Sequence, residues 1–218
     1  MYFRDRKEAG NKLADELYHA YANTDSVILC IGDAVDMCQA ISEKLNLPVL
    51  WLLTETIDIP RESLTIGTMI HMGGFSYNPD LSEGQVNDYL AEFHGAIDQE
   101  KDEAIHKLNR KIQSSTDIMA DSDKLRDKNV IFVADGLKGG AVISSISEFL
   151  KPVRLKRLIA AVAVADVSAV DKLHLNTDEL HVLMPVANYY GVDHYFSENM
   201  DVDDQELVAQ LQKMAPKT

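Results

Sequence analysis

Five short, almost wholly apolar runs separated by helix-like segments are the feature that most constrains the fold of this chain of 218 residues. Runs of this length and composition, bounded by turn-forming residues, are typical of strands buried on both faces of a sheet. Strands joined through helices lie parallel and cross over in the right-handed sense. The alternation therefore predicts a Rossmann-like α/β fold with a parallel sheet flanked by helices. The expected strands are residues 26–31, 48–53, 129–133, 157–165 and 179–186.

The segments around these runs have the periodicity of helices. Leu13, Leu17 and Tyr21 recur every four residues among charged residues, which predicts an amphipathic helix within residues 1–23. The other expected helices cover 37–45, the stretch that ends near Leu150, 168–176 and 203–214.

One region breaks the alternation. Residues 57–80 contain two prolines and several glycines between short β-like pieces, so we expect an irregular, hairpin-like excursion from the sheet. Residues 82–113 follow as one long polar helix, and Ser82 with Gln85 has the spacing of a capping box. We interpret the whole chain as a single domain, 1–218, in which 57–113 is the excursion plus the long helix. The polar helix is expected to be a solvated face without chemistry.

The charge balance excludes one class of partner. The net charge is −14 and the sequence pI is about 4.8, so charge-driven binding of nucleic acid is not expected.

No apolar run approaches the roughly 20 residues of a membrane span, and the charged N-terminus lacks a signal-peptide core. We therefore expect a cytoplasmic protein without membrane contact. Cys30 and Cys38 form no disulfide framework and are expected to be buried.

The stretch "VADGLKGGAV", residues 133–142, is the strongest candidate for a binding site. It places a glycine-rich turn between a strand and a helix, where backbone N–H groups and the helix dipole favour anions. Asp135 has the oxygens to accept two ribose hydroxyls, and Lys138 carries a charge suited to phosphate. The alternative is a tight turn that needs its glycines only for backbone geometry. The spacing, which matches neither the Walker loop nor GxGxxG, leaves both interpretations open.

Two further groups of side chains have a structural alternative. His174, His181 and His194 lie in separate elements without metal-ligand spacing, which favours scattered surface histidines over a metal site. The aromatic residues near the C-terminus form either a stacking hood for a base or a packed cluster, and packing is favoured. They are Tyr189, Tyr190, Tyr195 and Phe196.

Several segments in order carry a family resemblance. "FRDRKEAG" at 3–10, "LTIGTM" at 64–69, the glycine-rich stretch at 133–142 and the ending from Met184 to Leu211 together resemble type I phosphoribosyltransferases. They are most similar to a bacterial branch of that family, over nearly the whole chain. The resemblance implies a phosphoribosyltransferase-like fold. It also implies transfer of a ribosyl group from phosphoribosyl pyrophosphate to a nitrogen or related nucleophile, with Mg²⁺ as cofactor.

The resemblance also implies roles for particular residues. Asp135 would be the catalytic carboxylate, which holds the ribose or acts as a base. A loop after the first core strand would bind pyrophosphate, and the glycine-rich loop would bind the 5-phosphate. The implied pyrophosphate loop is Gly32, Asp33 and Ala34, and the implied phosphate ligands are Lys138, Gly139, Gly140 and Ala141.

The departures from the family pattern fall on the chemistry. Ala134 replaces the first acid of a pair, and Gly139 and Val142 stand where the family has threonine. Asp33 and Glu55 stand where the branch has cationic residues. One like-charge contact at ~4 Å and an effective dielectric constant of ~20 costs on the order of 4 kcal/mol, so pyrophosphate binding should be much weakened.

Two hypotheses follow from these residues. In the first, the protein binds a phosphorylated ribose, either phosphoribosyl pyrophosphate or a nucleotide, with weak transfer that would need Mg²⁺. In the second, it is a catalytically inactive relative that serves as a nucleotide-sensing, regulatory or oligomeric module. A small-molecule partner and a homodimer are expected; the acceptor base is not indicated by any motif.

Overall fold

The main sheet has five parallel strands in the order β2-β1-β6-β7-β8. The computed structural model describes residues 2–60, 62, 64–71, 74–113, 116–199 and 204–215. Each strand coincides with one of the apolar runs, so the predicted parallel sheet is confirmed. The strands are β1 (Ser26–Ile31), β2 (Val49–Leu52), β6 (Asn129–Leu137), β7 (Arg157–Asp166) and β8 (Glu179–Val186).

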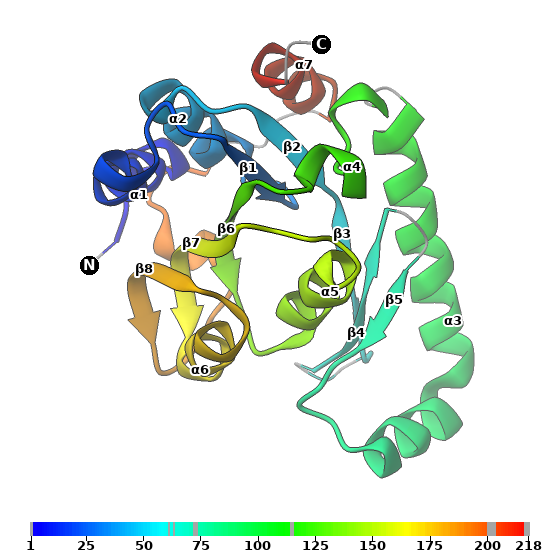
Figure 1. The fold of residues 1–218 in the computed structure, drawn as a ribbon. Coiled ribbons are helices and arrows are strands. Elements are labelled where there is room, and N and C mark those ends of the chain that lie inside the picture. The colour runs from blue at the N-terminus through cyan, green and yellow to red at the C-terminus, as the bar shows by residue number, and fades with distance from the viewer. Residues whose placement is uncertain are drawn as a thin grey trace.

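Helices cover both faces of this sheet (Figure 1). One face carries α1 (Arg6–Tyr21) and α2 (Val35–Leu45), with α7 (Asp204–Met214) packed beside α2. The other face carries α5 (Ala141–Leu150) and α6 (Val167–Asn176). This arrangement is the one expected when helical crossovers connect parallel strands.

The core forms two apolar layers, one on each side of the sheet, because successive residues of a strand point to opposite faces. Leu17 and Trp51 pack in the layer beneath α1 and α2, and Phe132 packs in the layer beneath α5. Burial of a large apolar side chain stabilises the fold by about 1.5–3 kcal/mol. Cys30 and Cys38 are fully buried, as predicted, and burial raises the pKa of the Cys30 thiol.

The excursion is more regular than the sequence indicated. It forms a second, antiparallel sheet of β3 (Thr54–Asp58), β4 (Thr65–Ile70) and β5 (Phe75–Tyr77). It therefore begins at residue 54, before the predicted start at 57. The tight pairing of β4 with β5 needs a glycine, because a Cβ on Gly67 would overlap Phe75 and the Ser76 carbonyl oxygen.

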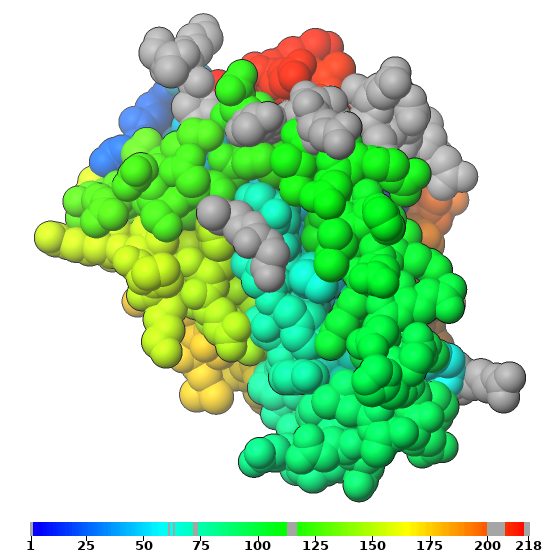
Figure 2. All heavy atoms as spheres, turned by 90° about the vertical axis from the view of Figure 1, so that its right-hand side faces the viewer, coloured from blue at the N-terminus to red at the C-terminus, as the bar shows by residue number. Residues whose placement is uncertain are grey.

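The long polar helix is confirmed as α3 (Glu83–Gln113), with a kink at Phe93. Its capping box is present: the Ser82 N–H donates to Gln85 Oε1 at 2.9 Å, and the Gln85 N–H donates to Ser82 Oγ at 3.3 Å. Figure 2 shows α3 lying along the outer side of the excursion, whose strands reach the surface between α3 and the segment that contains α5.

Strand β6 is longer than predicted. The sequence indicated a strand at 129–133 and a turn from 134 to 142, but β6 pairs with β7 as far as Leu137 opposite Ala165. The prediction was wrong because the apolar residues of β7 continue to supply hydrogen-bonding partners beyond Val133. Ala134 is buried in the layer beneath α5, and only residues 138–140 remain between β6 and α5.

The remaining elements are short. The polar connection after α3 contains η1 (Thr116–Ile118) and α4 (Ser122–Leu125), and η2 (Val192–Tyr195) follows β8. The Asp121 carboxylate caps α4 by accepting from the N–H groups of Asp123 and Lys124. Within the described residues, no helix combines the length and the apolar character needed to cross a membrane.

Candidate functional site

A pocket of about 860 Å³ opens at the carboxyl ends of β1 and β6. Its walls come from the loop after β1, from β3 and β4 of the excursion, from the start of α5 and from residues 189–193. Ligands of open α/β sheets bind beyond this edge, and the volume lies within the usual range for small-molecule sites. The pocket is therefore the candidate functional site.

The charged residues that line this pocket are unevenly distributed. The lining cations Arg6 and Lys138 lie at the end formed by β6, α1 and α5. The wall formed by the loop after β1 and by the excursion carries four carboxylates: Asp33, Glu55, Asp58 and Glu62. Asp135 and Asp193 line the pocket at the same end as the two cations, and Arg6 contacts both, so carboxylates and cations are equal in number there.

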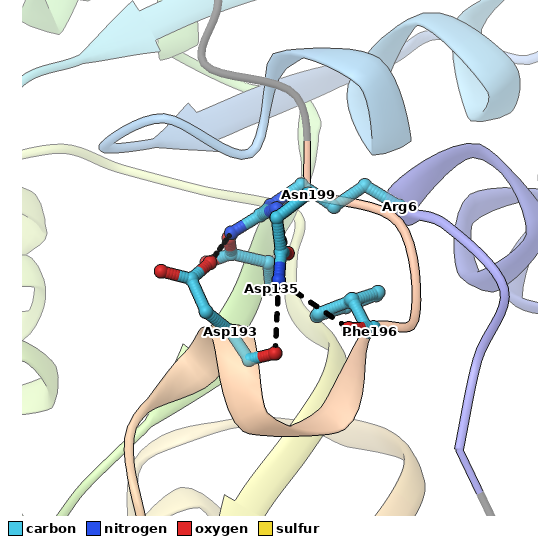
Figure 3. A network of polar contacts seen from close by, with 5 residues as sticks. All are labelled: Arg6, Asp135, Asp193, Phe196 and Asn199. Atoms are coloured by element: carbon cyan, nitrogen blue, oxygen red, sulfur yellow. Dashed lines mark hydrogen bonds and ion pairs between the residues drawn. The ribbon is translucent and has the colours of Figure 1, made fainter.

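The predicted catalytic residue, Asp135, is held in an ion pair (Figure 3). The Arg6 guanidinium donates from Nε to Asp135 Oδ2 at 2.8 Å and from Nη2 to Asp193 Oδ1 at 2.8 Å. A third donation runs from Nη1 to Asn199 Oδ1 at 3.1 Å. The side chains of Arg6 and Asp135 are each 17% exposed. Burial raises the pKa of Asp135, although Arg6 acts in the opposite direction.

Sequence reasoning missed Arg6 as a functional residue. It opens α1, whose N-cap is Asp5 with its carboxylate accepting from the Glu8 N–H at 2.7 Å. A cation in the first turn of a helix is disfavoured by the helix dipole. The position of Arg6 in the first turn therefore indicated that its guanidinium makes a contact outside the helix. The partner itself lies 129 positions away in sequence and could not be identified locally.

The implied pyrophosphate loop contributes one residue to the pocket. Asp33 lines it and accepts from Lys111 Nζ at 2.8 Å, although Asp33 is 63% exposed and Lys111 only 11%. The long helix α3, which was expected to be a solvated face, carries Lys111 to Asp33 at this pocket. Gly32 and Ala34 do not line the pocket; Ala34 is fully buried, and the Gly32 carbonyl accepts from Trp51 Nε1 at 2.6 Å.

The predicted phosphate-binding amides already bind carboxylates of the chain itself. The Gly139 N–H donates to Asp166 Oδ2 at 3.0 Å, and the Gly140 N–H donates to Asp80 Oδ2 at 3.1 Å. Asp80 also pairs with Lys172 of α6. Both N–H groups therefore donate to carboxylate oxygens of the chain itself, an arrangement that a nest of amides favours. A phosphate that used both amides would have to displace both carboxylates.

The glycines of this segment also have packing reasons. A Cβ at Gly136 would overlap the hydroxyl of Tyr189, and a Cβ at Gly140 would overlap the side chain of Lys172. Gly139 has a φ of +62°, a conformation that side chains disfavour. Packing at Gly136 and backbone conformation at Gly139 thus account for these two glycines without a ligand, whereas the atoms met at Gly140 belong to a flexible lysine side chain.

The start of α5 remains on the pocket wall. Lys138, Ala141 and Val142 line the pocket, whereas Gly139 and Gly140 do not. Gly140 is the N-cap of α5 and supplies no side-chain hydrogen bond to the helix. The first helical N–H groups have no partner within a helix, so this position is suited to an anionic group next to Lys138.

The aromatic residues divide between the two predicted roles. Tyr195 and Phe196 are buried, and the Tyr195 hydroxyl donates to the Asn188 carbonyl at 2.9 Å, which confirms packing for this pair. Tyr189 and Tyr190 line the pocket, where stacking on a planar ring is open to them. Burial and the neighbouring Asp135 raise the pKa of Tyr189.

The histidines are placed apart, as the spacing indicated. His181 contacts Glu16 and Glu179, whereas His194 contacts the Tyr2 hydroxyl. Within the described ranges, no three His, Cys, Asp or Glu side chains are grouped so as to hold a metal ion. The Mg²⁺ that the resemblance implies is a cation that binds mainly through ligand phosphates and water, and no residue of the chain is assigned to it.

Comparisons with known proteins were made at the levels of sequence and structure. No protein-family model and no curated protein sequence matches the chain. A hypoxanthine phosphoribosyltransferase from Staphylococcus aureus is 12% identical, covers 87% of this chain and 78% of its own, and has a TM-score of 0.49. A hypothetical protein from Neisseria gonorrhoeae with bound ppGpp is 12% identical, covers 89% and 91%, and has a TM-score of 0.45.

A full-length structural likeness is found to the protein TT1426 from Thermus thermophilus. It covers 99% of this chain and 100% of that one, with 20% identity and a TM-score of 0.70. The two chains therefore share one fold over nearly their whole length. The predicted arrangement is confirmed: the chain has an α/β fold in which a parallel five-stranded sheet is flanked by helices.

Proposed function

We propose that this protein binds a ribose ligand with a single phosphate, of the nucleoside monophosphate class, and transfers ribosyl groups weakly or not at all. The observation that carries the proposal is the uneven distribution of charge in the 860 Å³ pocket, where the lining cations lie at one end and four carboxylates lie on another wall. One end offers Lys138, the start of α5 and Asp135, and the opposite wall offers carboxylates. A ligand with one anionic group fits this division, and a ligand with anionic groups at both ends does not.

Each part of such a ligand has a matching group. The phosphate lies next to Lys138 and the first turn of α5, where charge and helix dipole act together. A ribose hydroxyl donates to Asp135, because a carboxylate whose Oδ2 is bound by Arg6 still has acceptor sites for the sugar. The base packs against Tyr189 or Tyr190, which form part of the same pocket.

Pyrophosphate meets the least favourable wall. Asp33 lies where the family resemblance implies the pyrophosphate loop, and Glu55, Asp58 and Glu62 line the adjacent wall. Lys111 offsets part of the charge of Asp33. Repulsion at this wall opposes binding of phosphoribosyl pyrophosphate unless Mg²⁺ screens it. Loss of the transfer reaction is therefore the expected consequence.

Isothermal titration calorimetry tests the proposal directly. AMP, GMP, UMP and ribose 5-phosphate are compared with phosphoribosyl pyrophosphate, each with and without Mg²⁺, and pyrophosphate release is assayed in parallel. We expect at least one monophosphate to bind about tenfold more tightly than phosphoribosyl pyrophosphate, a difference of about 1.4 kcal/mol. Tighter binding of phosphoribosyl pyrophosphate with release of pyrophosphate would identify an active transferase instead.

A matched pair of lysine variants locates the phosphate. Lys138→Ala removes the lysine that lines the pocket, and Lys151→Ala removes an exposed lysine at the end of α5 that does not line it. The first variant should weaken monophosphate binding, and the second should not. If neither the wild type nor any variant binds a phosphorylated ribose, the proposal fails, and the chain is better described as a non-enzymatic interaction module.

A further inference from the structure

Arg6 connects three parts of the chain that are distant in sequence. It stands in the first turn of α1, pairs with Asp135 of β6 and reaches Asp193 and Asn199 of the segment after β8 (Figure 3). Its guanidinium carbon lies 4.9 Å from the centre of the Phe196 ring. Because a guanidinium presents its donors in a fixed plane, three simultaneous partners fix its orientation and that of the Asp135 carboxylate.

Arg6 is also the cation among the groups around Asp135 that are named next. The others are Asp33 from the loop after β1, Cys30 from β1, and Tyr189 and Asp193 from the segment after β8. Burial and the charge of Asp33 raise the pKa of Asp135, whereas Arg6 and a backbone hydrogen bond lower it. Removal of Arg6 would leave burial and Asp33 opposed only by that backbone hydrogen bond, so the carboxyl would hold its proton to a higher pH.

The segment that Arg6 holds forms part of the pocket. Residues 189–193 line one wall, and the residues that follow are hydrogen-bonded to the N-terminus. The Phe3 N–H donates to the Tyr195 carbonyl at 2.9 Å, and the Ser197 N–H donates to the Phe3 carbonyl at 2.9 Å. The N-terminal segment and residues 189–199 therefore form one unit that Arg6 joins to Asp135.

We propose that Arg6 is a positioning residue for the ligand: it orients Asp135 to accept a ribose hydroxyl and joins the occupied site to the 189–199 wall. This inference rests on the proposed function and extends it, because it assigns a role to a residue that never contacts the phosphate. It implies that ligand binding orders residues 189–199. It also implies that the affinity for the ligand depends on pH through Asp135.

The test compares Arg6→Gln, Arg6→Lys and Asp135→Asn with the control Arg4→Gln. Arg4 is 65% exposed and pairs with Asp5 outside the pocket, so it matches the charge change without touching the site. The Asp135 carboxyl is titrated by carbon-13 NMR without ligand, AMP binding is measured by calorimetry across the same pH range, and hydrogen exchange is followed in 189–199. The titration of the AMP phosphate is common to all variants and cancels in the comparison.

We expect Arg6→Gln to raise the pKa of Asp135, to weaken AMP binding about tenfold or more and to speed exchange in 189–199. Its affinity loss should grow as the pH falls, and Asp135→Asn should abolish that dependence. Arg6→Lys should lie between, and it keeps the test usable if the glutamine variant fails to fold. An unchanged AMP affinity and pH profile in Arg6→Gln would overturn the inference.

The outcomes separate this inference from the function on which it rests. If the wild type binds no phosphorylated ribose, the proposed function fails and the positioning role for a ligand fails with it. The NMR titration then still decides whether Arg6 controls the protonation of Asp135. If the wild type binds AMP and the Arg6 variants bind it equally well, the function stands and only the role of Arg6 is refuted.

Discussion

The pocket contains two aspartate–cation pairs that differ in burial. Arg6 and Asp135 are both 17% exposed, and Arg6 makes two further polar contacts with Asp193 and Asn199. Asp33, paired with Lys111, is 63% exposed. A charge removed from water costs several kcal/mol when its partner is lost, whereas a solvated charge costs little. The two pairs should therefore respond very differently to the same kind of substitution, although Asp135 and Asp33 line the same cavity.

The largest expected effect is on the buried pair. Arg6→Gln leaves Asp135 buried without its counter-charge, and breaking a buried pair typically costs about 3–5 kcal/mol of stability. Urea unfolding should show a lower midpoint, with Arg4→Gln within about 0.5 kcal/mol of the wild type. A loss below about 1 kcal/mol in Arg6→Gln would mean that solvent reaches Asp135 freely and that the contrast between the pairs is false.

A second substitution tests the packing around the buried pair. Gly136→Ala places a methyl group against the Tyr189 hydroxyl, so the tyrosine must move from the wall near Asp135. Overpacking of this kind costs about 1–3 kcal/mol. Gly84→Ala is the matched control, because a Cβ there meets nothing within 4 Å. Thermal unfolding of both variants measures the difference, and equal melting temperatures would show that Tyr189 relaxes without cost.

The sequence was sufficient for the fold and insufficient for the site, and the two pairs show why. The strands follow from local apolar runs, because each run records its own burial. The Arg6–Asp135 and Lys111–Asp33 pairs join residues 129 and 78 positions apart, and no local pattern encodes such contacts.

The glycine-rich loop shows a different limit of sequence reasoning. An anion-binding turn was predicted, and the amides of Gly139 and Gly140 do bind anionic groups. Those groups are Asp166 and Asp80 of the chain itself, which only the tertiary structure brings to the loop. The same spacing is compatible with a free ligand site and with an internally satisfied turn, so composition alone could not separate the two.

The Lys111–Asp33 pair, in which the aspartate is exposed and the lysine is 11% exposed, offers a test of binding. Asp33→Asn removes a carboxylate from the wall opposed to pyrophosphate, so affinity for phosphoribosyl pyrophosphate should rise about tenfold, equivalent to about 1.4 kcal/mol. AMP affinity should change less, because the AMP phosphate lies next to Lys138, although the loss of Asp33 also removes a charge that raises the pKa of Asp135. Calorimetry of both ligands on the wild type and the variant gives the result. Equal changes for both ligands would contradict the division of the pocket into two ends.

The smallest expected effect is on the stability contribution of Lys111. Lys111→Met keeps most of the buried aliphatic stem and removes the ammonium group, leaving an aspartate that is already 63% exposed. Exposed partners of ion pairs rarely contribute more than about 1 kcal/mol, so the loss of stability should stay below that value and diminish further in high salt. Urea unfolding at low and high salt measures it. A loss as large as that of Arg6→Gln would mean that Asp33 depends on Lys111 as strongly as Asp135 depends on Arg6. The two ion pairs would then contribute equally to the stability of the fold. If the small loss is found, the wall that faces the pyrophosphate position can change its charge at little cost in stability, whereas the end around Asp135 cannot.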